Sequence, residues 1–206
     1  DKVLAKPAQL KSAVKIIALG ASTGGTEALA TLISGLRPPL PPIVIVQHIP
    51  SGFSRLFAER LNRESAFTVK EAADGDHLEP NHIYVAPGDR QMRVRALGDL
   101  LLLSCYGTEL VNGHCPSVDV LFDSVAPLGK AAIGVILTGM GADGAKGLLR
   151  MRQQGARTLG QNEHSSVVYG MPRAAYELGS VEKQLELSAM PMAIMHLAGH
   201  EGGCLH

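Results

Sequence analysis

The stretch KIIALGASTGGTEALATLISGL (residues 15–36) decides the fold. Its first part, KIIALG (15–20), is a short apolar run that ends in glycine, which is typical of a buried strand. Its last part, TEALATLISGL (26–36), carries apolar residues at helical spacing. A buried strand joined to a helix by a glycine-rich turn predicts the first unit of an α/β domain.

The same alternation continues along the chain. Further strands are predicted at 43–48, 82–88, 131–137, 155–161 and 181–187, and helices at 51–65, 115–129, from Gly144 to about Gln154, 172–178 and 190–200. Residues 91–97 and 100–106 flank a Gly-Asp turn and predict a hairpin. We therefore expect an α/β fold with a doubly wound, mostly parallel sheet, helices on both faces and a small antiparallel hairpin.

Composition bounds the class of protein. The 206 residues suit one α/β domain, and 46% hydrophobic against 18% charged residues favour a packed core. Lysine and arginine (19) balance aspartate and glutamate (19), which argues against a nucleic-acid partner. The three cysteines form no CxxC pair, and no apolar run is long enough to insert into a membrane. We expect a cytoplasmic protein, with residues 1–14 as a linker tail and 15–206 as one domain.

The turn after the first strand carries a candidate nucleophile. Residues 20–24 fit the pattern G-x-S-x-G with Ser22 at the centre, where a sharp strand-to-helix turn exposes the hydroxyl. The small residues Gly24 and Gly25 would let a substrate approach, and the N–H of Thr23 points where an oxyanion would form. The alternatives are a phosphate-binding turn and a helix N-cap, because both use the same residue types.

A histidine and an aspartate follow two other predicted strands. His48 ends the strand 43–48 and is a candidate base, although on its own a hydrogen-bonded structural histidine is favoured. Asp143 lies in TGMGADG (138–144), where it could orient His48 or cap a helix. The glycines of that loop let backbone N–H groups approach a ligand, so Met140, beside Gly141, is a candidate second oxyanion donor.

The carboxyl ends of parallel strands meet at one edge of a sheet, where ligands bind. Residues that follow different strands can therefore form one site. Ser22, His48 and Asp143 each follow a different strand. Their chain order, Ser then His then Asp, differs from the Ser-Asp-His order of α/β-hydrolases. The pattern therefore predicts a serine hydrolase outside that fold family.

Long blocks of the chain resemble the catalytic domain of chemotaxis protein-glutamate methylesterases. The resemblance spans residues 15 to about 187. Its blocks are IALGASTGGTEAL (17–29), VQHIPSGFSRLFAERLN (46–62), YVAPGD (84–89), PSVDVLFDSVA (116–126), GVILTGMGADGAKGL (134–148) and QNEHSSVVYGMPRAA (161–175). Blocks of this length in this order are far more specific than a lone G-x-S-x-G.

The resemblance implies hydrolysis of glutamate γ-methyl esters, and deamidation of glutamines, on methyl-accepting chemotaxis receptors. It matches Ser22 to the family's nucleophile, His48 to its base and Asp143 to its orienting acid, and it implies no metal and no organic cofactor. Family members usually carry an N-terminal receiver domain, so residues 1–14 resemble the end of its linker. Cys115 stands where the family commonly has arginine, which puts in doubt any substrate contact of that arginine.

The residues alone allow three alternative interpretations. GASTGG after the first strand resembles the turn of a dinucleotide-binding oxidoreductase, but that class needs an acidic residue after the second strand, where Gln47 and His48 stand. Cys115 beside His114 is a weaker candidate nucleophile, since sequence neighbours point in different directions and cysteine usually packs as a small apolar residue. An inactive interaction domain is not favoured, because all three triad positions are filled.

Overall fold

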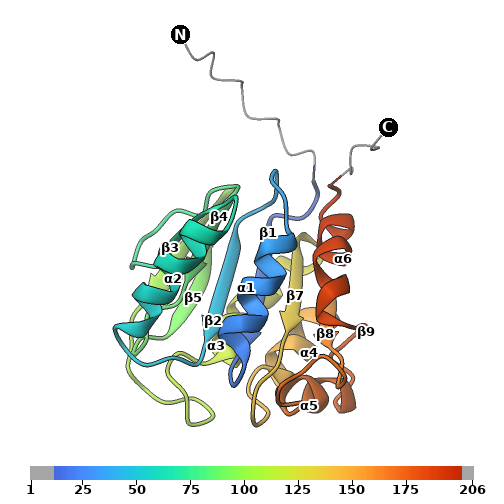
Figure 1. The fold of residues 1–206 in the computed structure, drawn as a ribbon. Helices are drawn as coiled ribbons and strands as arrows, with labels where there is room; N and C mark the ends of the chain where they lie inside the picture. Colours follow the sequence, from blue (N-terminus) through green and yellow to red (C-terminus); the bar gives the residue numbers. More distant parts are fainter. Residues whose placement is uncertain (1–11, 201–206) are drawn as a thin grey trace.

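A computed structural model describes residues 12–200, and its centre is a seven-stranded sheet in which every pairing is parallel (Figure 1). The strands are β1 (Ile16–Ala21), β2 (Ile43–Gln47), β3 (Thr68–Glu71), β4 (His82–Val85), β7 (Ala132–Ile136), β8 (Arg157–Gln161) and β9 (Lys183–Leu185), in the order β3-β4-β2-β1-β7-β8-β9. The hairpin of β5 (Met92–Leu97) and β6 (Leu100–Cys105) forms a separate antiparallel sheet.

Helices cover both faces of the large sheet (Figure 1). One face carries α1 (Gly25–Gly35), α2 (Phe53–Glu64) and α6 (Met190–Leu197), and the other carries α3 (Val118–Val125), α4 (Ala145–Gln153) and α5 (Met171–Glu177). Two short 3₁₀ segments, Ala126–Ala131 and Leu187–Ala189, precede β7 and α6. Within residues 12–200, no helix is both long enough and apolar enough to cross a membrane.

The central strand β1 explains why the sheet needs both layers. Its six residues are all buried, as a strand covered on two faces requires. Ile17 and Leu19 belong to the core beneath α1, α2 and α6, whereas Ile16 and Ala18 belong to the core beneath α3, α4 and α5. Side chains of a strand alternate between faces, so an unbroken apolar run serves both cores at once.

The predicted fold class is confirmed, and two elements differ most from the prediction. The sequence analysis missed β3, a four-residue edge strand in which only Val69 is buried, so it has no apolar run to reveal it. The helix predicted at 115–129 is shorter, because α3 begins at Val118 and gives way to the 3₁₀ segment at Ala126. The predicted linker tail lies outside the described residues except for residues 12–14.

The order of the strands determines where a site can form. From β1 the chain first builds one half of the sheet through β2, and it returns later to place β7 on the other side of β1. A crevice forms at the carboxyl ends of the strands where the direction of winding reverses. The loops that follow β1, β2 and β7 meet there.

We expect Phe122→Ala to lower the free energy of unfolding by about 3–5 kcal/mol, because Phe122 is completely buried between α3 and the sheet. Denaturant-induced unfolding measures the change. The matched control is Leu97→Ala in the hairpin, where the side chain is 65% exposed, and its effect should stay within about 0.5 kcal/mol. Equal losses in the two variants would contradict this account of the core.

Candidate active site

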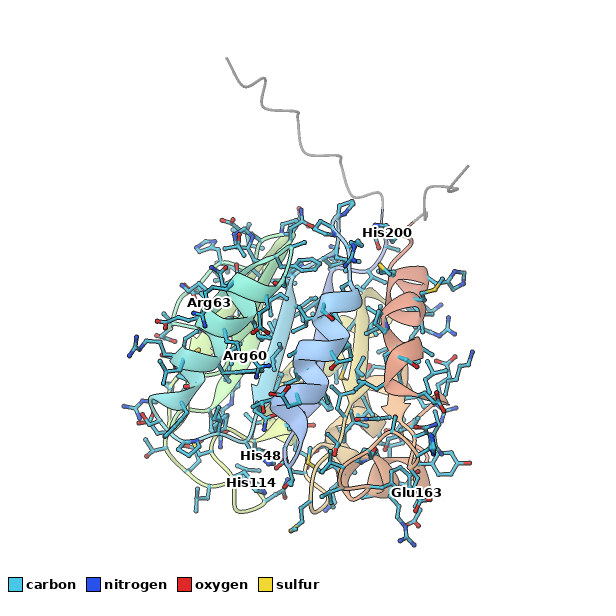
Figure 2. The ribbon with its side chains drawn as sticks, in the orientation of Figure 1. His48, Arg60, Arg63, His114, Glu163 and His200 are labelled. Carbon is cyan, nitrogen blue, oxygen red and sulfur yellow. The ribbon has the colours of Figure 1, made fainter. Side chains whose placement is uncertain are left out.

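Ser22 and His48 lie side by side because β1 and β2 are neighbours in register. Ala21 pairs with Gln47, and the N–H of His48 donates to the carbonyl of Ala21 at 3.2 Å. Ser22 directly follows Ala21, the last residue of β1, and His48 directly follows Gln47, the last residue of β2. Both are half-buried at the carboxyl edge of the sheet, and Figure 2 shows His48 at this edge, near the start of α1.

The backbone of Ser22 is held from several directions. Its N–H donates to the carbonyl of Thr138 at 3.0 Å, which ties the turn after β1 to the loop after β7. Its carbonyl accepts from the N–H of Gly25 at 2.7 Å and from Nε2 of Gln47 at 2.8 Å. A Cβ on Gly139 would lie 2.8 Å from Cβ of Ser22, so only glycine lets this loop approach so closely.

His48 and Asp143 form a short hydrogen bond at the edge of the sheet. Nε2 of His48 lies 2.7 Å from Oδ2 of Asp143, with 9% and 1% of the two side chains exposed. The other ring nitrogen, Nδ1 of His48, is buried and has no hydrogen-bond partner among residues 12–200. Since the carboxylate accepts the proton on Nε2, the lone pair of a neutral His48 lies on Nδ1.

Four further donors surround the carboxylate of Asp143. Oδ1 accepts from Asn112 Nδ2 at 2.8 Å, Ser117 Oγ at 2.8 Å and the N–H of Asp119 at 3.1 Å, and Oδ2 accepts from the N–H of Val118 at 2.8 Å. With His48, these donors saturate both oxygens of a buried charge.

The same contacts keep Asp143 ionised. Burial on its own would raise the pKa of this carboxyl, but the hydrogen bonds from His48, Asn112, Val118 and Ser117 outweigh it and hold the pKa well below its ordinary value. Nearby Asp119 behaves differently, because burial is the largest influence on that carboxyl and raises its pKa. Asp143 therefore presents a fixed negative charge to His48.

Asp143 is both a helix cap and the partner of His48. It accepts the N–H groups of Val118 and Asp119, the first residues of α3, whereas the N-cap of its own helix α4 is Gly144. Ser117 occupies the predicted N-cap position of α3, but its hydroxyl donates to Asp143 and makes no capping bond. The two functions that the sequence left as alternatives therefore coexist in one side chain.

The sequence analysis missed Asn112, and it considered His114 only as a neighbour of Cys115. Both belong to the turn 111–114, in which Val111 and His114 exchange two backbone hydrogen bonds of 2.9 Å. Asn112 and Gly113 both have positive φ, 55° and 78°, as a type I′ turn requires. The Asn-Gly pair was therefore a readable signal for this turn, but nothing local showed that the turn reaches Asp143.

The candidate oxyanion donors differ in their availability. The N–H groups of Thr23 and Met140 make no hydrogen bond within the described residues, and both residues are exposed. Gly25 N–H is already bonded to Ser22. Gly24 and Gly141 have φ of 78° and 90°, which favours glycine over other residues in these two loops.

A pocket of about 490 Å³ opens beside Asp143, with Asn112, His114, Lys146 and Leu178 in its walls.

Cys115 makes a poor nucleophile, because burial raises the pKa of its thiol and keeps it protonated. Across residues 12–200 no cluster of three or more histidine, cysteine, aspartate and glutamate side chains is arranged to hold a metal ion.

A doubly wound α/β domain with a serine beside a histidine–aspartate pair has the architecture and side-chain chemistry of a serine hydrolase. The chain belongs to the CheB methylesterase family, whose model matches residues 17–194. This membership confirms the resemblance seen in the sequence, and it does not support a dinucleotide-binding oxidoreductase. The catalytic roles of Ser22, His48 and Asp143 stay predictions.

Similar proteins agree with this assignment. The chain is 52% identical over 183 residues to protein-glutamate methylesterase/protein-glutamine glutaminase 2 of Syntrophomonas wolfei subsp. wolfei, covering 88% of this chain and 54% of the relative. It is 56% identical over 185 residues to protein-glutamate methylesterase/protein-glutamine glutaminase 1 of Rhizobium johnstonii, covering 89% and 53%. The chain thus spans about half the length of these curated relatives.

A solved structure matches the fold closely. The crystal structure of the Thermotoga maritima CheB methylesterase catalytic domain aligns with a TM-score of 0.86 at 35% sequence identity. The alignment covers 89% of this chain and 98% of the other. The agreement supports the doubly wound architecture over almost the whole described chain.

We expect Asp143→Asn to lower the free energy of unfolding at pH 7 by about 1–3 kcal/mol, because a neutral amide caps α3 and binds His48 less well. The lowered pKa of Asp143 adds stability that is complete above its unfolded value of about 3.9 and is lost as the pH falls toward the folded value. The difference in the free energy of unfolding between wild type and Asp143→Asn should therefore become smaller as the pH falls from 5 to about 3. Denaturant unfolding at these pH values measures it.

Asp123→Asn is the matched control for that experiment. Asp123 pairs with Arg150 on the surface, where its side chain is 42% exposed, so the loss should be small at every pH. If the loss of unfolding free energy in Asp143→Asn, relative to wild type, stays constant down to pH 3, the ionised carboxylate does not stabilise the fold.

Proposed function

We propose that this chain is the catalytic domain of a cytoplasmic serine hydrolase that removes methyl groups from glutamate γ-methyl esters, and deamidates glutamines, on methyl-accepting chemotaxis receptors. Family membership and the printed names of the relatives support the substrate class. The observation that carries the proposal is the buried pair of His48 and Asp143 beside Ser22.

The first step is attack of Ser22 on the ester carbonyl. Nδ1 of His48 takes the hydroxyl proton, since Nε2 is occupied by Asp143 and Nδ1 has no other partner within residues 12–200. Asp143 holds the ring in this tautomer and stabilises the imidazolium that forms. This arrangement uses the two ring nitrogens in the reverse order from the chymotrypsin triad, where Nδ1 faces the aspartate.

The tetrahedral oxyanion is stabilised by backbone N–H groups. Thr23 follows the nucleophile directly, and Met140 stands in the loop that Gly139 brings against Ser22. Each donor contributes roughly 3–4 kcal/mol by comparison with known oxyanion holes. Because the donors are main-chain groups, the side chains of Thr23 and Met140 can vary with little effect on the chemistry.

The tetrahedral intermediate collapses when the protonated His48 gives its proton to the leaving methoxide, which departs as methanol and leaves an acyl-enzyme on Ser22. His48 then takes a proton from a water that attacks the acyl-enzyme, and it returns this proton to the Ser22 oxygen as the free carboxyl product leaves. With a glutamine substrate the leaving group is ammonia. These steps require neither a metal nor an organic cofactor.

The partner would be the cytoplasmic helical region of a receptor, presented at the carboxyl edge of the sheet. Exposed apolar side chains from three loops stand near this edge, namely Leu110, Met140 and Val167. The pocket beside Asp143 and His114 adjoins this edge, but neither Ser22 nor His48 lines it. Because the chain spans about half of its relatives, a receiver domain in the full-length protein is part of the proposal.

We expect Ser22→Ala to lower the rate of methanol release from methylated chemoreceptor membranes by at least about a thousandfold, because no other group can form the acyl-enzyme. The matched control is Ser34→Ala on the exposed end of α1, where the hydroxyl bonds only to the carbonyl of Thr31, and its rate should equal that of wild type. Equal release by wild type and Ser22→Ala would overturn the proposed nucleophile.

A further inference from the structure

His114 makes the closest ring contact in the site. Its imidazole stacks on that of His48 with 3.6 Å between ring centroids and 8° between ring planes, and Figure 2 shows the two labelled residues together at the edge of the sheet. Aromatic pairs usually keep their centroids about 4.5–7 Å apart. So close and so parallel a contact covers one whole face of His48.

The position of His114 is fixed by the turn that carries it. Two hydrogen bonds with Val111 close the turn, and Gln91, a completely buried residue, donates through Nε2 to the carbonyl of His114 at 3.0 Å. Nδ2 of Asn112 donates to Asp143 at 2.8 Å and to Asp119 at 2.7 Å. The turn is therefore anchored to the same carboxylate that holds His48.

The hydrogen bond to Asp143 leaves the plane of the His48 ring without a restraint, and a stacked neighbour can supply one. One hydrogen bond from Nε2 to Asp143 fixes that nitrogen but lets the ring plane turn about the bond. Nδ1, the nitrogen that the proposed mechanism assigns to the Ser22 proton, has no hydrogen-bond partner within the described residues. A flat ring packed against one face sets the ring plane and therefore the direction of the lone pair.

We propose that His114 is a positioning residue of this site, which holds the imidazole of His48 in plane against Asp143 and stabilises the positive charge that His48 gains when it takes the proton of Ser22. The charge part of this inference rests on the proposed function, and the positioning part rests on the stacked geometry alone. A neutral aromatic face next to a cation is a favourable arrangement.

The charges around His114 keep its ring neutral. Burial and the neighbouring charge of His48 lower the pKa of His114, and Asp143 opposes them more weakly. His48 and Asp143 are the titratable groups that face it across the stack. Because two stacked rings resist carrying two charges, the proton of the reaction stays on His48.

Two substitutions separate stacking from other roles of His114. His114→Phe keeps a flat aromatic ring, whereas His114→Ala removes it. We expect His114→Ala to lower kcat for methanol release about 3- to 30-fold with KM unchanged, and His114→Phe to stay within about threefold of wild type. His82→Ala is the matched control, since His82 lies at the start of β4, at the opposite end of the strands from His48, where its ring contacts Glu79, Pro80 and Tyr84.

A second measurement needs no substrate. The ring proton on Nε2 of His48 is observable by NMR, and its exchange with water reports how firmly the ring is held against Asp143. We expect faster exchange in His114→Ala and wild-type exchange in His114→Phe and His82→Ala. If wild type releases no methanol, the proposed function fails, yet the exchange rates still test the positioning of His48.

Three results would overturn the inference. Wild-type kcat and wild-type exchange in His114→Ala would show that the stack does nothing for His48. Equal impairment of the phenylalanine and alanine variants would show that the imidazole nitrogens matter rather than the ring face. A fall in thermal stability that accounts for the whole loss of activity in His114→Ala would assign His114 a structural role only.

Discussion

The carboxylate of Asp143 is the point on which the site depends. It is a buried charge that accepts five hydrogen bonds, from His48, Asn112, Ser117 and the N–H groups of Val118 and Asp119. An unpaired charge in such a place would cost far more than a small domain can tolerate. Each donor is therefore held in place by the same ion that it stabilises, and the loops that carry them form one unit.

Through Asp143 the side chains of the candidate site are connected to the main packing of the molecule. The N-terminus of α3 supplies two of the five donors, and α3 is anchored in the core by Phe122 and its neighbours. The positive end of that helix favours a negative charge at this point. A rigid helix packed on the sheet thus fixes the position of the Asp143 carboxylate and, through it, of Nε2 of His48.

Glycine residues are equally important around the turn of Ser22, because they have no side chain. Gly139 lets the loop after β7 touch the turn of Ser22, and a Cβ at Gly25 would collide with the side chain of Gln47. These close approaches let the carbonyl of Thr138 bind the N–H of Ser22. Ser22 is therefore positioned mainly through its main-chain atoms, whereas His48 and Asp143 are positioned mainly by side-chain contacts.

The sequence alone determined the parallel sheet, its two helical layers and the edge at which Ser22, His48 and Asp143 gather. Apolar periodicity is a local property, and parallel strands direct all their carboxyl ends to one edge, so these features could be predicted from short segments. Only the tertiary structure decided that Asp143 caps α3 and binds His48, which lies 95 residues away in the chain. It also decided that the Asn112 turn reaches this carboxylate and lays His114 on His48. Such contacts join segments that share no local pattern, because they arise from the way in which distant loops pack together at one end of the sheet.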